Sequence, residues 1–161
     1  MCDYSLMCVP NRLAKEHEDL VMHRFPTGSL GFASPYDLYQ VQSAMEARAG
    51  GFWRALKNFL TPPKISQVPA VCIPPGARLR LGGIPKRLQM DLDIGTEEDV
   101  TFTQLTAMAN TYRDAVRFKN GYRVRLQDLS EGVHAKVLDL SLASEYEPFQ
   151  EERARALFGL R

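Results

Sequence analysis

Alternation of apolar and charged side chains between Val68 and Ser141 constrains the fold of this chain more than any other feature. Successive side chains of a strand point to opposite faces, so strict alternation predicts one buried face and one face in water. The alternating segments are residues 77–81, 90–94, 100–103, 116–118 and 122–126, with shorter candidates at 71–73 and 136–140. They predict a mainly β fold, an antiparallel sheet that forms a small barrel or a strongly curved sheet.

The turn at residues 119–121 allows the register of two strands to be worked out. A two-residue turn would pair Phe118 with Arg123 and so place an apolar and a charged side chain on one face. A bulged three-residue loop pairs Phe118 with Tyr122 instead, and each face then stays uniform. This register predicts that Tyr122 faces inward and that Arg117 lies directly opposite Arg123 on the outer face.

Opposed arginines repel each other by about a few tenths of a kcal/mol, so an acidic group should lie near them. One source is a neighbouring strand, on which Asp91 and Asp93 are expected to face outward. The other is an anionic ligand. The candidate ligand-binding residues are the five arginines expected on the outer face: Arg78, Arg80, Arg117, Arg123 and Arg125.

Composition excludes several classes of protein. The 161 residues are about one domain in length, and 45% are hydrophobic, which is enough for a core without disulfide or metal staples. The net charge is only +1, and no exposed aromatic residue is expected beside the arginines, so nucleic acid is an unfavoured ligand. No apolar run is long enough to span a bilayer, and the N-terminus lacks the features of a secretory signal. Three cysteines cannot all pair within one chain, which favours a reducing cytoplasm.

Residues before Val68 predict strands followed by helices. Residues 4–9, 19–25 and 30–33 are expected to be strands, with a turn at 26–28. Ser34-Pro35-Tyr36-Asp37 is typical of a helix start, and this helix is expected to end at about Arg48. We therefore expect one domain over residues 1–161, with a helical insertion at about 35–64 and a C-terminal helix at about 147–158.

A second helix is expected over residues 52–60, and it gives the candidate partner-binding residues. Phe52, Trp53, Leu56 and Phe59 share one face of it, while basic residues lie elsewhere. Such a helix binds a partner or a membrane surface, or it packs on the sheet of its own chain. A helix this short is rarely stable alone, which favours packing on the sheet.

Several short runs of the sequence resemble a group of small uncharacterised bacterial proteins. These runs are Met1-Cys2-Asp3-Tyr4-Ser5-Leu6, residues 21–25, 31–33 and 71–76, and Phe118-Lys119-Asn120-Gly121. The resemblance implies a shared small β fold and a bacterial cytoplasmic origin, and it implies no activity. It also implies that histidines of the group are replaced here at Met7 and Tyr112-Arg113, so that a metal site of the group is absent, with Cys2, Cys72 and Asp114 left as shared polar positions.

Cys2 is the candidate catalytic residue. Removal of Met1 would place its thiol beside a free α-amine, which can act as the base for this nucleophile. The alternative is a small hydrophobic residue that opens a strand. The metal-ligating residue types of the chain match no zinc spacing: Cys2, Cys8, Cys72, His17, His23 and His134. Residues 82–86 are expected to form a turn without the strand-to-helix context of a phosphate-binding loop.

These observations favour a non-enzymatic binding or assembly module in the bacterial cytoplasm. It would recognise a protein or an anionic ligand through the outer arginines or the helix at 52–60. The alternative is an enzyme or a metal-binding protein built around an N-terminally processed Cys2.

Overall fold

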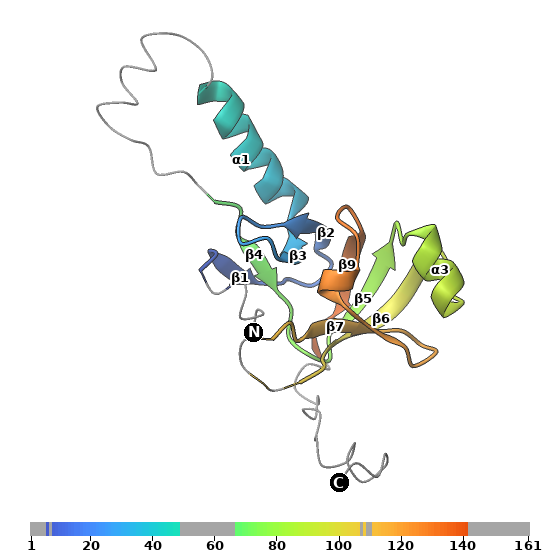
Figure 1. Ribbon diagram of the computed structural model, residues 1–161. Coiled ribbons are helices and arrows are strands. Elements are labelled where there is room, and N and C mark those ends of the chain that lie inside the picture. The colour runs from blue at the N-terminus through green and yellow to red at the C-terminus, as the bar shows by residue number, and fades with distance from the viewer. Residues whose placement is uncertain (1–5, 7, 49–66, 107, 109–110, 142–161) are drawn as a thin grey trace.

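The computed structural model in Figure 1 describes residues 6, 8–48, 67–106, 108 and 111–141. Its main feature is a seven-stranded antiparallel sheet in the spatial order β3-β2-β9-β5-β6-β7-β8. The strands are β2 Asp19–Arg24, β3 Leu30–Ala33, β5 Arg78–Gly82, β6 Glu97–Gln104, β7 Asp114–Arg117, β8 Arg123–Arg125 and β9 His134–Asp139. The sheet curls into a half-barrel, which confirms the curved sheet, although the barrel is not closed (Figure 1).

The last strand among the described residues occupies the middle of this sheet. β9 pairs on one side with β2 and on the other with β5, so it joins the β2–β3 hairpin to the β5–β8 meander. Ala135 of β9 lies opposite Leu20 on one side and Leu81 on the other, and all three are buried. The hydrophobic core therefore runs continuously across strands that are far apart in the chain.

Most of the predicted alternation is confirmed. In β5, Leu79 and Leu81 are fully buried, while Arg78 and Arg80 are exposed. The three-residue loop is also confirmed, because Val116 pairs with Val124, Arg117 pairs with Arg123, and the Phe118 N–H donates to the Tyr122 carbonyl over 2.8 Å.

The inward orientation predicted for Tyr122 is wrong, since its side chain is 55% exposed. Tyr122 precedes the first residue of β8 and lies at the tip of the hairpin, where the curled sheet no longer covers it. Phe118, directly opposite, is buried as predicted.

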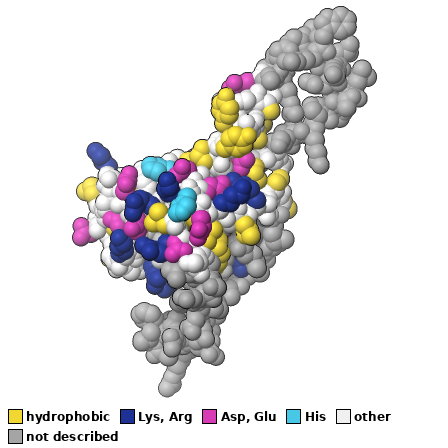
Figure 2. All heavy atoms as spheres, turned by 180° about the vertical axis from the view of Figure 1, so that it is seen from behind, with side chains coloured by type: hydrophobic (Ala, Val, Ile, Leu, Met, Phe, Trp, Pro, Cys, Tyr) yellow, Lys and Arg dark blue, Asp and Glu magenta, His cyan; other side chains and the backbone are white. Residues whose placement is uncertain are grey.

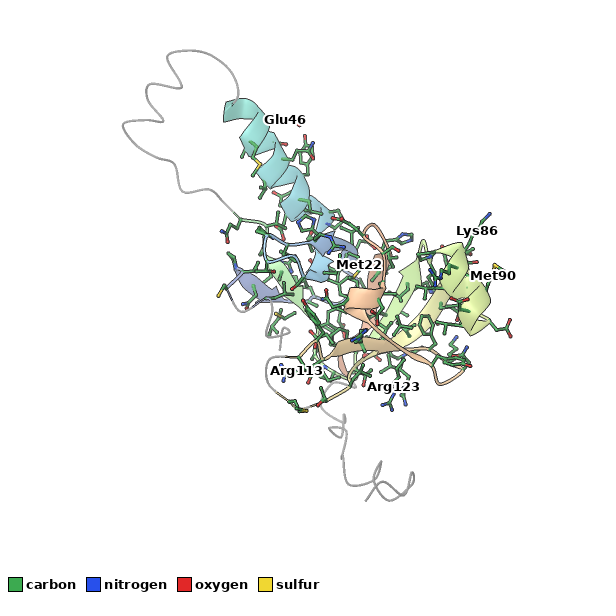
Figure 3. All side chains as sticks on the ribbon, viewed as in Figure 1. Met22, Glu46, Lys86, Met90, Arg113 and Arg123 are labelled. Carbon is green, nitrogen blue, oxygen red and sulfur yellow. The ribbon has the colours of Figure 1, made fainter. Side chains whose placement is uncertain are left out.

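The strand predicted at residues 90–94 is wrong. Residues Lys86–Leu92 form helix α3, and Asp93 follows it in a left-handed conformation with φ of 53°. Leu88 and Leu92, four residues apart, pack against the core, so the helical period decides here over the alternation. Lys86 and Met90 project from α3 away from the sheet (Figure 3), and Met90 is 83% exposed.

The N-terminal half contains a short parallel strand pair and a long helix. β1, Asn11–Leu13, pairs in parallel with β4, Ala70–Cys72. In the described part of the strand predicted at 4–9, the Val9 N–H donates to the Leu6 carbonyl in a turn, so that prediction is wrong there. Helix α1, Pro35–Arg48, confirms the first predicted helix and projects from the body (Figure 1).

The helices predicted at 52–60 and 147–158 lie outside the described residues. Within the described residues, no helix is both long enough and apolar enough to cross a membrane.

A side chain links the two ends of the sheet. The 3-10 turn η2, Leu126–Asp128, follows the edge strand β8 and carries Gln127. The Gln127 amide accepts a hydrogen bond from the Leu30 N–H at 2.9 Å and donates to the Leu30 carbonyl at 2.7 Å. Leu30 belongs to β3, the opposite edge strand, so Gln127 provides the hydrogen bonds that an adjoining strand would otherwise make.

Candidate functional site

The strand register gathers three of the five predicted arginines into one row across the outer face of the sheet. Arg78 pairs with Thr101, Thr101 with Arg117, and Arg117 with Arg123. Adjacent strands lie about 4.8 Å apart, so Arg117 and Arg123 are immediate neighbours. The row ends at β9 with Asp139, which lies opposite Arg78. We call Arg78, Thr101, Arg117 and Arg123 the arginine row.

The next row along the strands is largely neutralised. Arg80 donates to Asp99 at 2.8 Å, and Lys119 approaches the other oxygen of Asp99 at 3.6 Å. Lys136 lies 4.0 Å from Asp19 at the far end of this row. Basic and acidic side chains are accordingly interleaved on the face of the molecule in Figure 2.

Asp99 is a stable anion in this row. The hydrogen bond from Arg80 holds the pKa of the Asp99 carboxyl below its ordinary value, and the charge of Lys119 adds to the effect. Asp99 therefore stays ionised well below neutral pH and compensates part of the charge of both cations.

No such carboxylate serves Arg117. Its guanidinium makes no hydrogen bond or ion pair with any residue that the structure describes, and its neighbour on β6 is the neutral Thr101. The acidic neighbours predicted for it are misplaced, because Asp91 lies within α3 and Asp93 directly follows that helix. Arg117 is exposed, so solvent and ligands reach it freely.

The remaining predicted arginines differ in their surroundings. Arg125 binds Asp128 through two hydrogen bonds of 2.7 and 3.0 Å. Arg78 lies near enough to Asp139 to help lower the pKa of that carboxyl, after the hydrogen bonds from Ser141. Arg123 points away from the sheet in Figure 3. All five face outward as predicted, but they do not form one uniform basic patch.

Two charged residues of this face, Asp99 and Lys119, were missed in the sequence. A cavity of about 340 Å³ beside Arg117 is lined by Asp99, Thr101, Arg117, Phe118, Lys119 and Gly121. Asp99 stands two residues before Thr101 in the same alternating strand, so the alternation itself could have placed it outward. Lys119 belongs to the hairpin loop, where alternation gives no direction.

Helix α1 offers a second, apolar surface. Grooves of about 830 and 490 Å³ flank it, and both are lined in part by Leu38 and Gln42. Tyr36, Tyr39 and Met45 of the helix are more than half exposed. At the rim of the larger groove, burial lowers the pKa of His23, and Glu131 at 3.7 Å opposes this shift. The predicted partner-binding residues of the neighbouring segment, Phe52, Trp53, Leu56 and Phe59, lie outside the described residues.

The beginning of α1 is fixed by an ion-pair network. Arg12 of β1 binds Glu18 and also reaches Asp37, in the first turn of the helix, at 3.2 Å. Burial opposes ionisation of Glu18, yet hydrogen bonds from Arg12 and the Lys15 N–H prevail and hold its pKa below the ordinary value. The network therefore attaches α1 to the strand pair beneath it.

The structure does not describe Cys2, so the catalytic prediction lies outside the described residues. Cys8 is exposed and free, whereas Cys72 is buried in β4 and disulfide-bonded. No group of three or more metal-ligating side chains occurs among residues 6, 8–48, 67–106, 108 and 111–141. The turn at Gly82-Gly83 does join a strand to a helix, contrary to the prediction, but α3 has only seven residues.

Comparisons with known proteins found no relative of this chain: no protein-family model, no curated protein and no solved structure matches it.

Proposed function

We propose that this protein is a non-enzymatic binding module that recognises an acidic partner protein through the arginine row. One observation carries the proposal: Arg117 is exposed, lies opposite Arg123, and has no carboxylate partner among the described residues. The neighbouring row carries its own compensating acids. A carboxylate on a partner would pair with Arg117 and offset the repulsion that Arg117 experiences from Arg123.

The physical consequence is electrostatic recognition that depends on salt. Exposed charge pairs each contribute little to affinity, about 1 kcal/mol or less, but a row of them accelerates association and aligns the partner. Because the net charge of the chain is only +1, the attraction is local to this face and does not belong to the molecule as a whole.

Charge reversal at Arg117 tests the proposal. We expect Arg117→Glu to weaken binding of a fluorescent oligoglutamate peptide by about tenfold or more, measured by anisotropy at low salt. Arg87→Glu is the matched control, because Arg87 is a 92% exposed arginine on α3 that makes the same change in net charge. Binding that weakens equally in both variants, or that does not fall with added salt, would refute recognition by the arginine row.

The bacterial cytoplasmic setting is part of the proposal and rests on the resemblance of the sequence. The disulfide at Cys72 counts against a reducing compartment, where such bonds are rare. The enzyme or metal protein built around Cys2 stays the alternative. It requires removal of Met1, which intact mass reveals directly.

A further inference from the structure

The cavity beside Arg117 has the composition of a small anion site. Its polar lining groups are the Arg117 guanidinium, the Lys119 ammonium, the Thr101 hydroxyl and the Asp99 carboxylate. Arg117 is the last residue of β7, and Lys119 follows it in the hairpin loop, yet both line this cavity. The Asp99 carboxylate faces Arg80 and Lys119 rather than Arg117.

The lining of this cavity leaves Arg117 as the cation to be compensated. It holds two cations, Arg117 and Lys119, and one carboxylate, Asp99, which lies 3.6 Å from Lys119 and binds Arg80, outside the lining, at 2.8 Å. Glu97 acts on Arg80 as well. A carboxylate ligand would bring two acceptor oxygens to Arg117, whereas a phosphomonoester carries a charge of about −1.5 to −2 at neutral pH and three acceptor oxygens, one for each of the donors Arg117, Lys119 and Thr101.

The donors also differ in a way that suits a phosphoryl group. A guanidinium offers a planar pair of N–H donors, an ammonium a compact charge with three donors, and a hydroxyl one further donor. Together these groups can donate hydrogen bonds to three oxygens from different directions. A planar carboxylate has only two oxygens and would leave one of the three groups without an acceptor.

We propose that this cavity binds the phosphoryl group of a phosphorylated side chain in the acidic partner. The inference rests on the proposed function and names the chemistry of the partner. The cavity lies within the arginine row, which places the phosphorylated side chain on the face proposed to bind the acidic partner. The same oxygens could come from free phosphate, so the test includes it.

The experiment compares three peptides that are identical except at one central position, which is phosphoserine, glutamate or serine, each flanked by acidic residues. Inorganic phosphate is the fourth probe. We expect the phosphopeptide to bind about tenfold more tightly than the glutamate peptide, measured by calorimetry at constant ionic strength. The preference should shrink below pH ~6, where the phosphomonoester loses its second charge.

Arg117→Gln and Lys119→Gln should each remove most of this preference, while Arg87→Gln on α3 should retain it. Thermal melting confirms that the variants fold. Equal affinity for the phosphopeptide and the glutamate peptide would overturn the phosphoryl site and leave the acidic partner standing. Inorganic phosphate that binds as tightly as the phosphopeptide would overturn the role of the partner. Failure of all three peptides to bind would overturn both proposals.

Discussion

At the scale of single residues, Gln127 makes the hydrogen bonds to the backbone of the edge strand β3 that a neighbouring strand usually makes. Its amide both accepts from and donates to the backbone of Leu30, and Leu30 itself is only 3% exposed. A buried backbone group that loses its partner costs about 1–3 kcal/mol, so the identity of this one side chain matters more than its exposure suggests.

Gln127→Glu tests this role with almost no change in size. The carboxylate still accepts from the Leu30 N–H, but it cannot donate to the Leu30 carbonyl. We expect a loss of about 1–3 kcal/mol in the free energy of unfolding, measured by urea denaturation at pH 7. Gln40→Glu, at an exposed position of α1, is the control and should change stability by less than about 0.5 kcal/mol. Similar values for both variants would mean that the link from η2 to β3 contributes nothing.

At the residue scale, the sequence predicts which face each arginine of the site lies on, but it does not predict which arginines have a carboxylate partner. Alternation placed all five arginines on the outer face, because a strand fixes the side of every residue in it. It did not distinguish Arg117 from Arg80, because their difference lies in the carboxylates across the strands. Such cross-strand neighbours depend on pairing between segments up to about a hundred residues apart, which local patterns do not contain.

At the scale of elements, the hairpin at 119–121 and the helix α3 show when a local pattern suffices. The hairpin was predicted with its register because only one loop length keeps both faces uniform. Residues 86–94 satisfied two patterns at once, since alternate residues and residues four apart were both apolar. Pro85 directly precedes the helix and the left-handed Asp93 directly follows it, and strand alternation takes account of neither.

Helix α1 is an element whose attachment should depend on pH. The pKa of Glu18 is lowered in the folded protein, so its ion pair with Arg12 stabilises the fold fully above its ordinary value of 4.5 and is lost as the pH falls through the folded value. We expect Glu18→Gln to destabilise the protein at pH 7, and the difference from the unmodified protein to shrink below pH 4.5. Urea denaturation at several pH values measures both curves. A difference that stays constant with pH would show that the Glu18 charge is not involved.

At the scale of the whole molecule, burial is unevenly distributed between the sheet and α1. The centre of the sheet is fully buried, with Leu79, Leu81 and Val137 at 0% exposure, whereas no described side chain of α1 is buried. Helices depend on such tertiary packing for most of their stability.

Hydrogen exchange should report this difference directly. We expect the amides of α1 to exchange about a hundredfold or more faster than those of β5 and β9, because opening the helix exposes little apolar surface. Exchange followed by mass spectrometry on peptides from residues 35–48, 78–82 and 134–139 gives the comparison. Equal protection of the helix would mean that something covers the grooves beside it.

The central position of β9 has a consequence for folding of the chain during its synthesis on the ribosome. The β2–β3 hairpin and the β5–β8 meander are synthesised before β9, and only residues 134–139, which pair with both, join them into one sheet. Until then both halves present an unpaired edge, the kind of template on which nascent chains aggregate. A nascent chain whose residues 134–139 have not yet left the ribosome therefore exposes both edges, and the emergence of these residues pairs the two units into one sheet.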